Sequence, residues 1–174
     1  MGDETVDQTR FVAMVESDLD EVVRIEALSG LTSWSRQSFL GELKNPLSFC
    51  FCLKREKERT CLVLGFICFR IVGEESELLN LGIDPQCRQK GWGRHLMRFY
   101  IDFCHEREVK IYFLETGVSN EPAIRLYESF AYRRTGIRPK FYGGRQDALL
   151  MMRRAETEGS SGNEPSDRVV DDFG

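Results

Sequence analysis

A basic turn with two glycines, residues 88–94 (RQKGWGR), has the residue types of an anion-binding site. An apolar run of strand character precedes the turn, and apolar residues at helical spacing follow it. A helix start leaves backbone N–H groups unpaired and carries partial positive charge, and a residue without Cβ lets a ligand approach the backbone. The three basic side chains add charge at the same place. The pattern therefore favours a pyrophosphate group as ligand.

Two common phosphate-binding motifs do not fit this turn. No Gly-Lys-Ser/Thr follows it, as the Walker A motif requires, and the third glycine of the dinucleotide fingerprint is absent. Arg88, Gly91 and Gly93 instead resemble the acetyl-CoA signature R/Q-x-x-G-x-G/A of the GNAT N-acetyltransferases. A loop with incidental glycines is the alternative interpretation.

Three further side chains lie where a structural role and a chemical role compete. Glu115 falls inside a strand-like run, where a carboxylate is costly to bury unless it is paired, hydrated or functional. A structural ion pair is the alternative there. Glu26 falls on the apolar stripe of the first expected helix, and the alternative is a helix-edge carboxylate that reaches solvent. Tyr127 shares a helical face with apolar residues and could be a core aromatic.

The elements that must position these residues follow a regular order. Strands are expected over 11–15, 47–53, 61–70, 78–83, 111–118, 132–137 and 148–152. Helices are expected from Ser17 or Asp18 to Gly30, from Ser35 to Lys44, after the basic turn, and from Asn120, with a loop over 138–146. This order, β-α-α-β-β-β-α-β-α-β-β, predicts an α+β fold with a mixed, mostly antiparallel central sheet flanked by helices.

The charge of the chain is unevenly distributed. The net charge of −4 depends on residues 155–174, which hold six acidic residues and one basic residue. Residues 1–154 hold 23 basic and 22 acidic residues and are therefore nearly neutral. Composition predicts one folded domain over 1–154 and a disordered acidic tail over 155–174. No apolar run could span a membrane and the polar start is not a signal peptide, so a cytoplasmic location is expected. Six cysteines without a Cys-x-x-Cys or His-rich cluster are expected to be reduced, with no metal site.

Across residues 10–152 the chain resembles the RimI family of the GNAT superfamily, the ribosomal-protein alanine N-acetyltransferases. Four groups of residues carry the resemblance: 114–129 (LExxxSNxxAxxLYES), Ile25-Glu26 followed by Trp34-Ser35, Asn80-x-x-Ile83-Asp84-Pro85, and Phe141-Tyr142 followed by 144–148 (GRQDA). The combination is much more specific than any single motif. It implies the GNAT fold.

The resemblance also implies an activity, the transfer of an acetyl group from acetyl-CoA to the N-terminal amine of a protein. In this family the acceptor is the N-terminal alanine of small-subunit ribosomal protein eighteen. An α-amine with a pKa near 8 must lose a proton before it attacks. Glu115 matches the family's general base, acting directly or through a water molecule, and Tyr127 matches the acid that protonates the departing thiolate.

The remaining site residues are likewise implied by the resemblance. The positions implied for acetyl-CoA are Ile83, Arg88, Gln89, Gly91, Trp92, Gly93, Arg94 and Asn120. Those implied for the acceptor-peptide groove are Glu26, Trp34 and Tyr142. The chain departs from the family at Ala131-Tyr132, where Gly-Phe is usual, and at Gly143, which replaces a proline, so peptide specificity stays open.

Two other functions remain as alternatives. One is a GNAT enzyme that acetylates a lysine or a small amine, and the other is a non-catalytic member that binds acyl-CoA. The expected partner is a protein N-terminus, that of a ribosomal protein. We expect no direct contact with nucleic acid or membrane, and a monomer or weak dimer.

Overall fold

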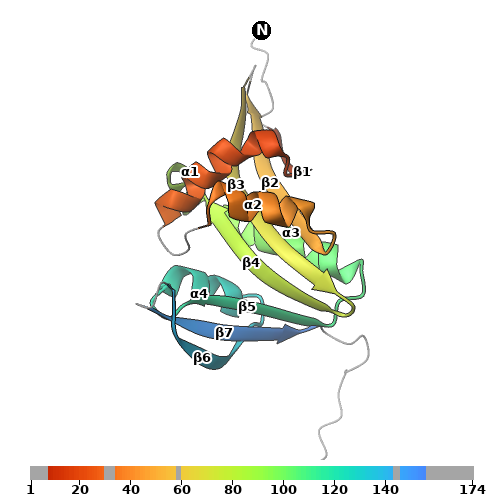
Figure 1. The fold of residues 1–174 in the computed structure, drawn as a ribbon, viewed down its shortest axis with the longest axis vertical. Coiled ribbons are helices and arrows are strands. Elements are labelled where there is room, and N and C mark those ends of the chain that lie inside the picture. The colour runs from red at the N-terminus through yellow and green to blue at the C-terminus, as the bar shows by residue number, and fades with distance from the viewer. Residues whose placement is uncertain (1–7, 30–33, 58–59, 143–145, 156–174) are drawn as a thin grey trace, which may run out of the picture.

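The computed structural model describes residues 8–29, 34–57, 60–142 and 146–155, in which seven strands form one sheet in the order β1-β2-β3-β4-β5-β7-β6 (Figure 1). The strands are β1 Gln8–Ala13, β2 Ser48–Lys57, β3 Thr60–Val72, β4 Glu75–Ile83, β5 Ile111–Gly117, β6 Arg133–Tyr142 and β7 Gln146–Arg154. The helices are α1 Leu19–Ser29, α2 Arg36–Lys44, α3 Trp92–His105 and α4 Glu121–Glu128, with 3-10 turns at Glu16–Asp18 and Pro85–Cys87. The order of strands and helices is the predicted one.

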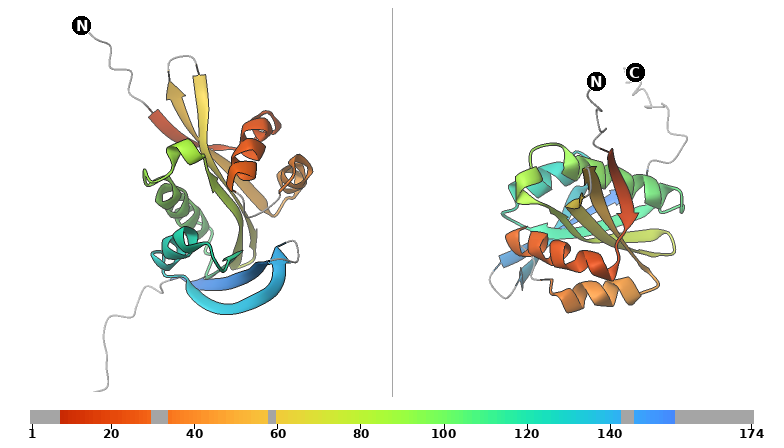
Figure 2. Two further views of the ribbon diagram at one scale, coloured as in Figure 1. Left: turned by 90° about the vertical axis from the view of Figure 1, so that its left-hand side faces the viewer. Right: turned by 90° about the horizontal axis from the view of Figure 1, so that it is seen from above.

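The helices cover the two faces of the sheet, α1 and α2 on one face and α3 and α4 on the other (Figure 2). Each pair of helices buries an apolar cluster against the strands. Under α1 and α2 lie Ile25, Phe39 and Phe66, all fully buried. A larger cluster lies between the sheet and the helices α3 and α4, and it includes Leu96, Tyr100, Leu114 and Tyr127. Burial of these apolar surfaces, about 25 cal/mol per Å², supplies the main driving force for this arrangement.

The sheet opens into a fork between β4 and β5, its only parallel pair among the described residues. The two strands pair over just four residues, from Glu75 opposite Ile111 to Leu78 opposite Leu114. Beyond that point β4 continues beside β3 and β5 continues beside β7, and the two strands diverge (Figure 1). Leu79 is an extra residue in β4 at this point, because Phe69 pairs with Leu78 whereas Cys68 pairs with Asn80. Such a bulge bends the strand and increases its twist.

Side-chain caps fix the helix starts that flank the fork. The hydroxyl of Ser35 accepts a hydrogen bond from the Ser38 N–H and caps α2, as the sequence predicted. The Asn120 side chain accepts from the Ala123 N–H at 3.4 Å and caps α4, and its amide donates to the hydroxyl of Thr116 at 3.3 Å. The second bond ties the start of α4 to the end of β5.

The prediction of a loop over 138–146 was wrong for residues 138–142. These residues continue β6, with Arg138 opposite Ala148 and Tyr142 opposite Gln146 on β7. Pro139, which lacks an N–H, is tolerated because β6 is the last strand of the sheet and one of its edges has no neighbour among the described residues. The glycines and basic residues of this segment had favoured a loop.

The end of the described chain lies beside the loop before β5. The backbone N–H of Ala155 donates to the carbonyl of Lys110 at 2.7 Å. The rest of the predicted acidic tail, 156–174, lies outside the described residues, as does Gly30, the predicted end of the first helix. None of the helices among the described residues has the length and apolar character needed to cross a membrane.

Candidate active site

Glu115 occupies the first position of β5 beyond the last residue paired with β4. Its neighbours Leu114 and Thr116 are buried, and they point to the face covered by α3 and α4. The alternation of the strand therefore turns the Glu115 carboxylate to the opposite face, as the sequence predicted. The side chain is 19% exposed, so the carboxylate reaches a solvent-accessible space at the fork.

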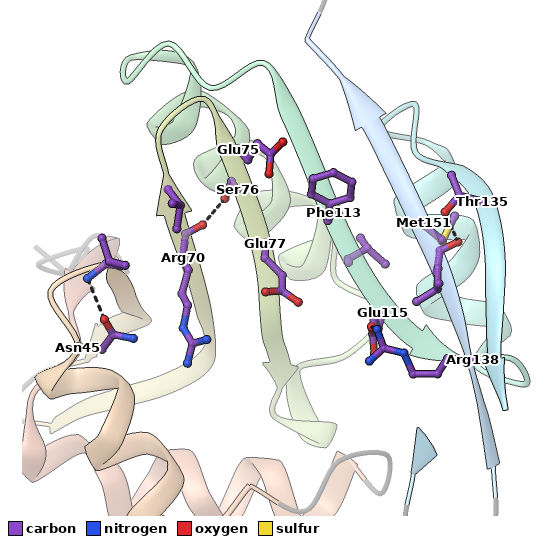
Figure 3. A pocket seen from close by; sticks show the side chains of 14 residues that line it. Asn45, Arg70, Glu75, Ser76, Glu77, Phe113, Glu115, Thr135, Arg138 and Met151 are labelled. Atoms are coloured by element: carbon purple, nitrogen blue, oxygen red, sulfur yellow. Dashed lines mark hydrogen bonds and ion pairs between the residues drawn. The ribbon is translucent and has the colours of Figure 1, made fainter. Parts of the chain in front are cut away.

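That space is a cleft of about 570 Å³ on the sheet face beside α2 (Figure 3). Its walls come from β3, β4, β5, β6 and β7 and from the segment after α2. The lining residues are Asn45, Leu47, Arg70, Val72, Glu75, Ser76, Glu77, Phe113, Leu114, Glu115, Thr135, Arg138, Leu150 and Met151. A cleft with apolar walls and a few charged groups suits a small part of a larger acceptor molecule.

The charge of Glu115 is held in place by Arg138. The Nη2 atom of Arg138 lies 2.9 Å from Oε1 of Glu115, and the guanidinium reaches across β7 from the edge strand β6 (Figure 3). Burial raises the pKa of Glu115, the Arg138 guanidinium lowers it, and the nearby Glu77 carboxylate raises it, with a net rise above the ordinary glutamate value. A carboxylate with a raised pKa is a stronger proton acceptor and so a better general base.

Tyr127 lies on the other face of the sheet from Glu115. It is 8% exposed on α4, belongs to the apolar cluster under α3 and α4, and its ring lies 6.1 Å from the ring of Tyr132. Tyr127 does not line the cleft that Glu115 lines. The two side chains could act on one substrate only at the fork, where β4 and β5 no longer pair.

The predicted anion site lies at the start of α3, which follows the free end of β4. Gly91 caps the helix with φ at +83°, a conformation that glycine adopts readily, and no atom lies within 4 Å of the position of a Cβ there. The first bond of the helix runs from the His95 N–H to the Gly91 carbonyl at 3.1 Å. The N–H groups of residues 92–94, in the first turn of α3, therefore have no partner within the helix and can bind an anion.

Other residues of the predicted cofactor site shape this turn. Gln89 has φ at +60°, and the Arg88 Nε donates to the carbonyl of Ile83 at 3.3 Å, which folds the turn back on the end of β4. Trp92 is half-buried and its ring lies 5.7 Å from that of His95. Gly93 also has a packing role, because a Cβ there would lie 3.3 Å from Leu126 of α4. The small size of Gly93 serves the packing of α3 on α4.

The three predicted acceptor-groove residues have different surroundings. Glu26 is 2% exposed on α1, and its carboxylate accepts from the Asn80 amide at 3.2 Å and from the Trp34 N–H at 3.3 Å. The alternative that Glu26 reaches solvent was wrong. Trp34 is half-buried and packs edge-on against Phe39 at 5.1 Å. Tyr142 is the last residue of β6, and its side chain lies outside the described residues.

Comparison with known proteins places this geometry in a family. The model of the acetyltransferase (GNAT) family matches residues 15–132. The chain belongs to the GNAT family. An Escherichia coli [ribosomal protein bS18]-alanine N-acetyltransferase is 30% identical over 139 residues, which cover 78% of this chain and 90% of that protein. A Bacillus subtilis protein, provisionally named for the same activity, is 32% identical over 136 residues, which cover 77% of this chain and 87% of that protein.

A solved structure agrees with this GNAT assignment. The crystal structure of the ribosomal-protein-S18-alanine N-acetyltransferase from Escherichia coli superposes with a TM-score of 0.73 at 26% identity, covering 90% of this chain and all of that one. The predicted GNAT fold, the predicted likeness to the RimI family and the predicted enzyme class, an acetyl-CoA-dependent N-acetyltransferase, are confirmed. The individual site residues stay predictions.

The sequence patterns did not predict two contacts of this GNAT domain. One is Arg138 beside Glu115, which depends on the register of β6 on β7, and no local pattern reports that register. The other is the ion pair between Arg24 of α1 and Asp84, at 2.6 Å, at the start of the 3-10 turn that precedes the predicted anion site. Asp84 also accepts from the Gln86 N–H at 2.9 Å. The Asp-Pro pair was a signal for a turn, but its partner on α1 is 60 residues away.

Proposed function

We propose that this GNAT enzyme acetylates the N-terminal α-amine of a protein, with the N-terminal alanine of ribosomal protein bS18 as acceptor. The observation that carries the proposal is the position of Glu115, a carboxylate with a raised pKa at the fork of β4 and β5 and facing an open cleft. The names of the relatives from Escherichia coli and Bacillus subtilis point to the same acceptor.

Acetyl-CoA would lie through the fork, with its pyrophosphate at the start of α3. The unpaired N–H groups after Gly91 and the exposed side chains of Arg88, Lys90 and Arg94 provide the charge for that group. The open space at the missing Cβ of Gly91 lets a phosphate approach the backbone. The pantetheine arm would follow the free end of β4 near Ile83 toward the bulge at Leu79.

The chemistry then needs proton transfers at the nitrogen and at the sulfur. Glu115 accepts a proton from the ammonium group, directly or through a water molecule, and the neutral amine then attacks the thioester carbonyl. The C–S bond breaks as the amide forms, and the nitrogen releases its second proton to solvent. Tyr127 gives its phenolic proton to the CoA thiolate from the other side of the fork. Tyr127→Phe should therefore lower kcat while the affinity for acetyl-CoA changes little, and a wild-type kcat would remove Tyr127 from this role.

Several contacts support a peptide acceptor at this cleft. Glu26 holds the Trp34 backbone and Asn80 of β4 together, so Trp34, two residues before α2, is fixed next to the bulge. The segment after α2 and strand β6 line opposite sides of the cleft through Asn45 and Thr135 (Figure 3). An α-amine is attached directly to the backbone, so its site must admit the first residues of a chain and cannot be a narrow tunnel.

The test is a panel of lysine-free peptides with the sequence of the bS18 N-terminus, beginning with alanine, serine, methionine or proline or with an acetylated alanine. CoA release should be fastest with alanine, slower with the other free N-termini and absent with the blocked peptide. Comparable rates for all free N-termini would limit the proposal to a general N-terminal acetyltransferase. No release with any peptide, while spermidine or free lysine is acetylated, would overturn it.

A further inference from the structure

Two carboxylates of β4 line the same cleft as Glu115. Glu75 and Glu77 alternate with the buried residues Ser76 and Leu78, so both side chains point to the cleft face of the sheet (Figure 3). Glu77 is exposed, and within the described part of the chain no hydrogen bond or ion pair engages its carboxylate or that of Glu75. The mechanism proposed above uses neither residue.

The two basic side chains of the cleft are engaged by other carboxylates. Arg138 pairs with Glu115 at 2.9 Å. Arg70 pairs with Glu42 of α2, to which its Nε donates at 3.0 Å and its Nη2 forms a second, shorter bond. Arg70 lies close enough to Glu77 to feel its charge, but the bidentate pair with Glu42 already neutralises the guanidinium. The cleft therefore keeps an excess of negative charge along β4.

The register of the strands gives the spacing between Glu77 and the reacting centre. Glu77 lies opposite Phe113 in the parallel pair, and Glu115 lies two residues farther along β5 on the same face. With about 3.3 Å per residue along a strand and about 4.8 Å between strands, the two Cα atoms are about 8 Å apart. An extended acceptor chain whose amine is at Glu115 would cover that distance within two or three residues.

We infer that Glu77, with Glu75 beyond it, binds a basic side chain at the second or third position of the acceptor peptide. The inference rests on the proposed N-terminal acetyltransferase function and narrows the acceptor to an N-terminus followed closely by a positive charge. Because Glu77 is open to solvent, its ion pair with the basic side chain of the peptide contributes only modest binding energy. The pair would therefore favour some acceptor peptides over others of similar shape.

The experiment compares kcat/KM for lysine-free peptides that begin with alanine and carry arginine at position two, three or four, with glutamine at the other two positions. Two further peptides have glutamine at all three positions, or glutamate in place of the arginine. Arginine is used because its guanidinium is not an acceptor for acetyl transfer at neutral pH. The enzymes are wild type, Glu77→Gln and Glu77→Arg. Glu106→Gln is the matched control, since it removes the same charge from an exposed site at the end of α3, on the other face of the sheet.

The wild-type enzyme should prefer arginine at position two or three over the all-glutamine peptide by about three- to tenfold. Glu77→Gln should reduce that ratio to less than about twofold, Glu77→Arg should reverse it in favour of a glutamate peptide, and Glu106→Gln should keep it. An equal wild-type rate for all these peptides, or a preference that survives in Glu77→Gln, would overturn the inference while N-terminal acetylation stands. Absence of N-terminal acetylation with every peptide would contradict both proposals.

Discussion

The Nη2 atom of Arg138 lies 2.9 Å from Oε1 of Glu115, so the carboxylate at the fork of the sheet is paired before any acceptor arrives. The pair joins β5 to the edge strand β6, with β7 between them. It opposes the effect of burial on Glu115, because the guanidinium lowers a pKa that burial raises. The pH dependence of the reaction should therefore depend on Arg138.

Arg138→Gln should move the acidic limb of the pH–rate profile to higher pH. Glu115 accepts a proton only when it is ionised, so activity falls as the pH drops through its pKa, and loss of the guanidinium raises that pKa further. The ratio of variant to wild-type kcat/KM should thus be smaller at pH 6 than at pH 9, a comparison in which the titration of the amine cancels. Arg138→Lys keeps the positive charge and should shift the limb less. A ratio independent of pH would show that Arg138 does not tune Glu115.

Glu115→Gln keeps the shape of the side chain and removes the base. At neutral pH kcat should fall about a hundredfold or more. The loss should shrink as the pH rises, because the amine then deprotonates without help. Glu106→Gln is the control, because it removes a carboxylate from an exposed site on the other face of the sheet and should keep kcat. An unchanged kcat in Glu115→Gln would exclude Glu115 as the base.

Gly91→Glu should weaken acetyl-CoA binding at least about tenfold, or about 1.4 kcal/mol. The new side chain would place bulk and negative charge in the open space where the pyrophosphate is proposed to bind. Gly73→Glu is a matched control, since Gly73 also has a positive φ, at +58°, and no atom within 4 Å of a Cβ, but it lies in the turn between β3 and β4. Titration calorimetry with both folded variants decides the point, and equal affinities would place the cofactor elsewhere.

Asp84→Asn should lower the free energy of unfolding at neutral pH by about 1–2 kcal/mol. Burial raises the pKa of Asp84, but the Arg24 guanidinium and the Gln86 N–H lower it by more, so the folded pKa lies below the ordinary value. A carboxyl group of this kind stabilises the fold above the unfolded pKa of about 3.9, and the contribution is lost as the pH falls through the folded pKa.

The difference in stability between wild type and Asp84→Asn should accordingly be full above about pH 5 and shrink toward pH 3. Glu21→Gln is the control, because Glu21 also pairs with Arg24, at 2.9 Å, but is 55% exposed. That variant should change the unfolding free energy by less than about 0.5 kcal/mol. Urea titrations at several pH values measure both, and a difference that grows as the pH falls would contradict the assignment.

Local patterns in the sequence predicted the elements and the chemistry better than they predicted the contacts. The caps Ser35 and Asn120 and the alternation around Glu115 are set by neighbouring residues, and the structure confirms all three. The end of β6 was missed because its pairing with β7 outweighs the loop-forming composition of 138–142. Glu26 on α1 is bound by Asn80 of β4, and Glu115 on β5 is bound by Arg138 of β6. Periodicity within one sequence does not reveal which residues of distant elements lie side by side, so neither contact was predicted.

The most direct test of the proposed function uses one peptide with two competing amines. It carries the bS18 N-terminus with a free alanine, followed by a sequence that includes one lysine, and it is incubated with the enzyme and acetyl-CoA. Fragmentation mass spectrometry then locates the acetyl group. The account predicts acetylation of the alanine α-amine with the lysine left free, at a rate that Glu115→Gln strongly reduces. Acetylation of the lysine, with the N-terminus left free, would contradict it.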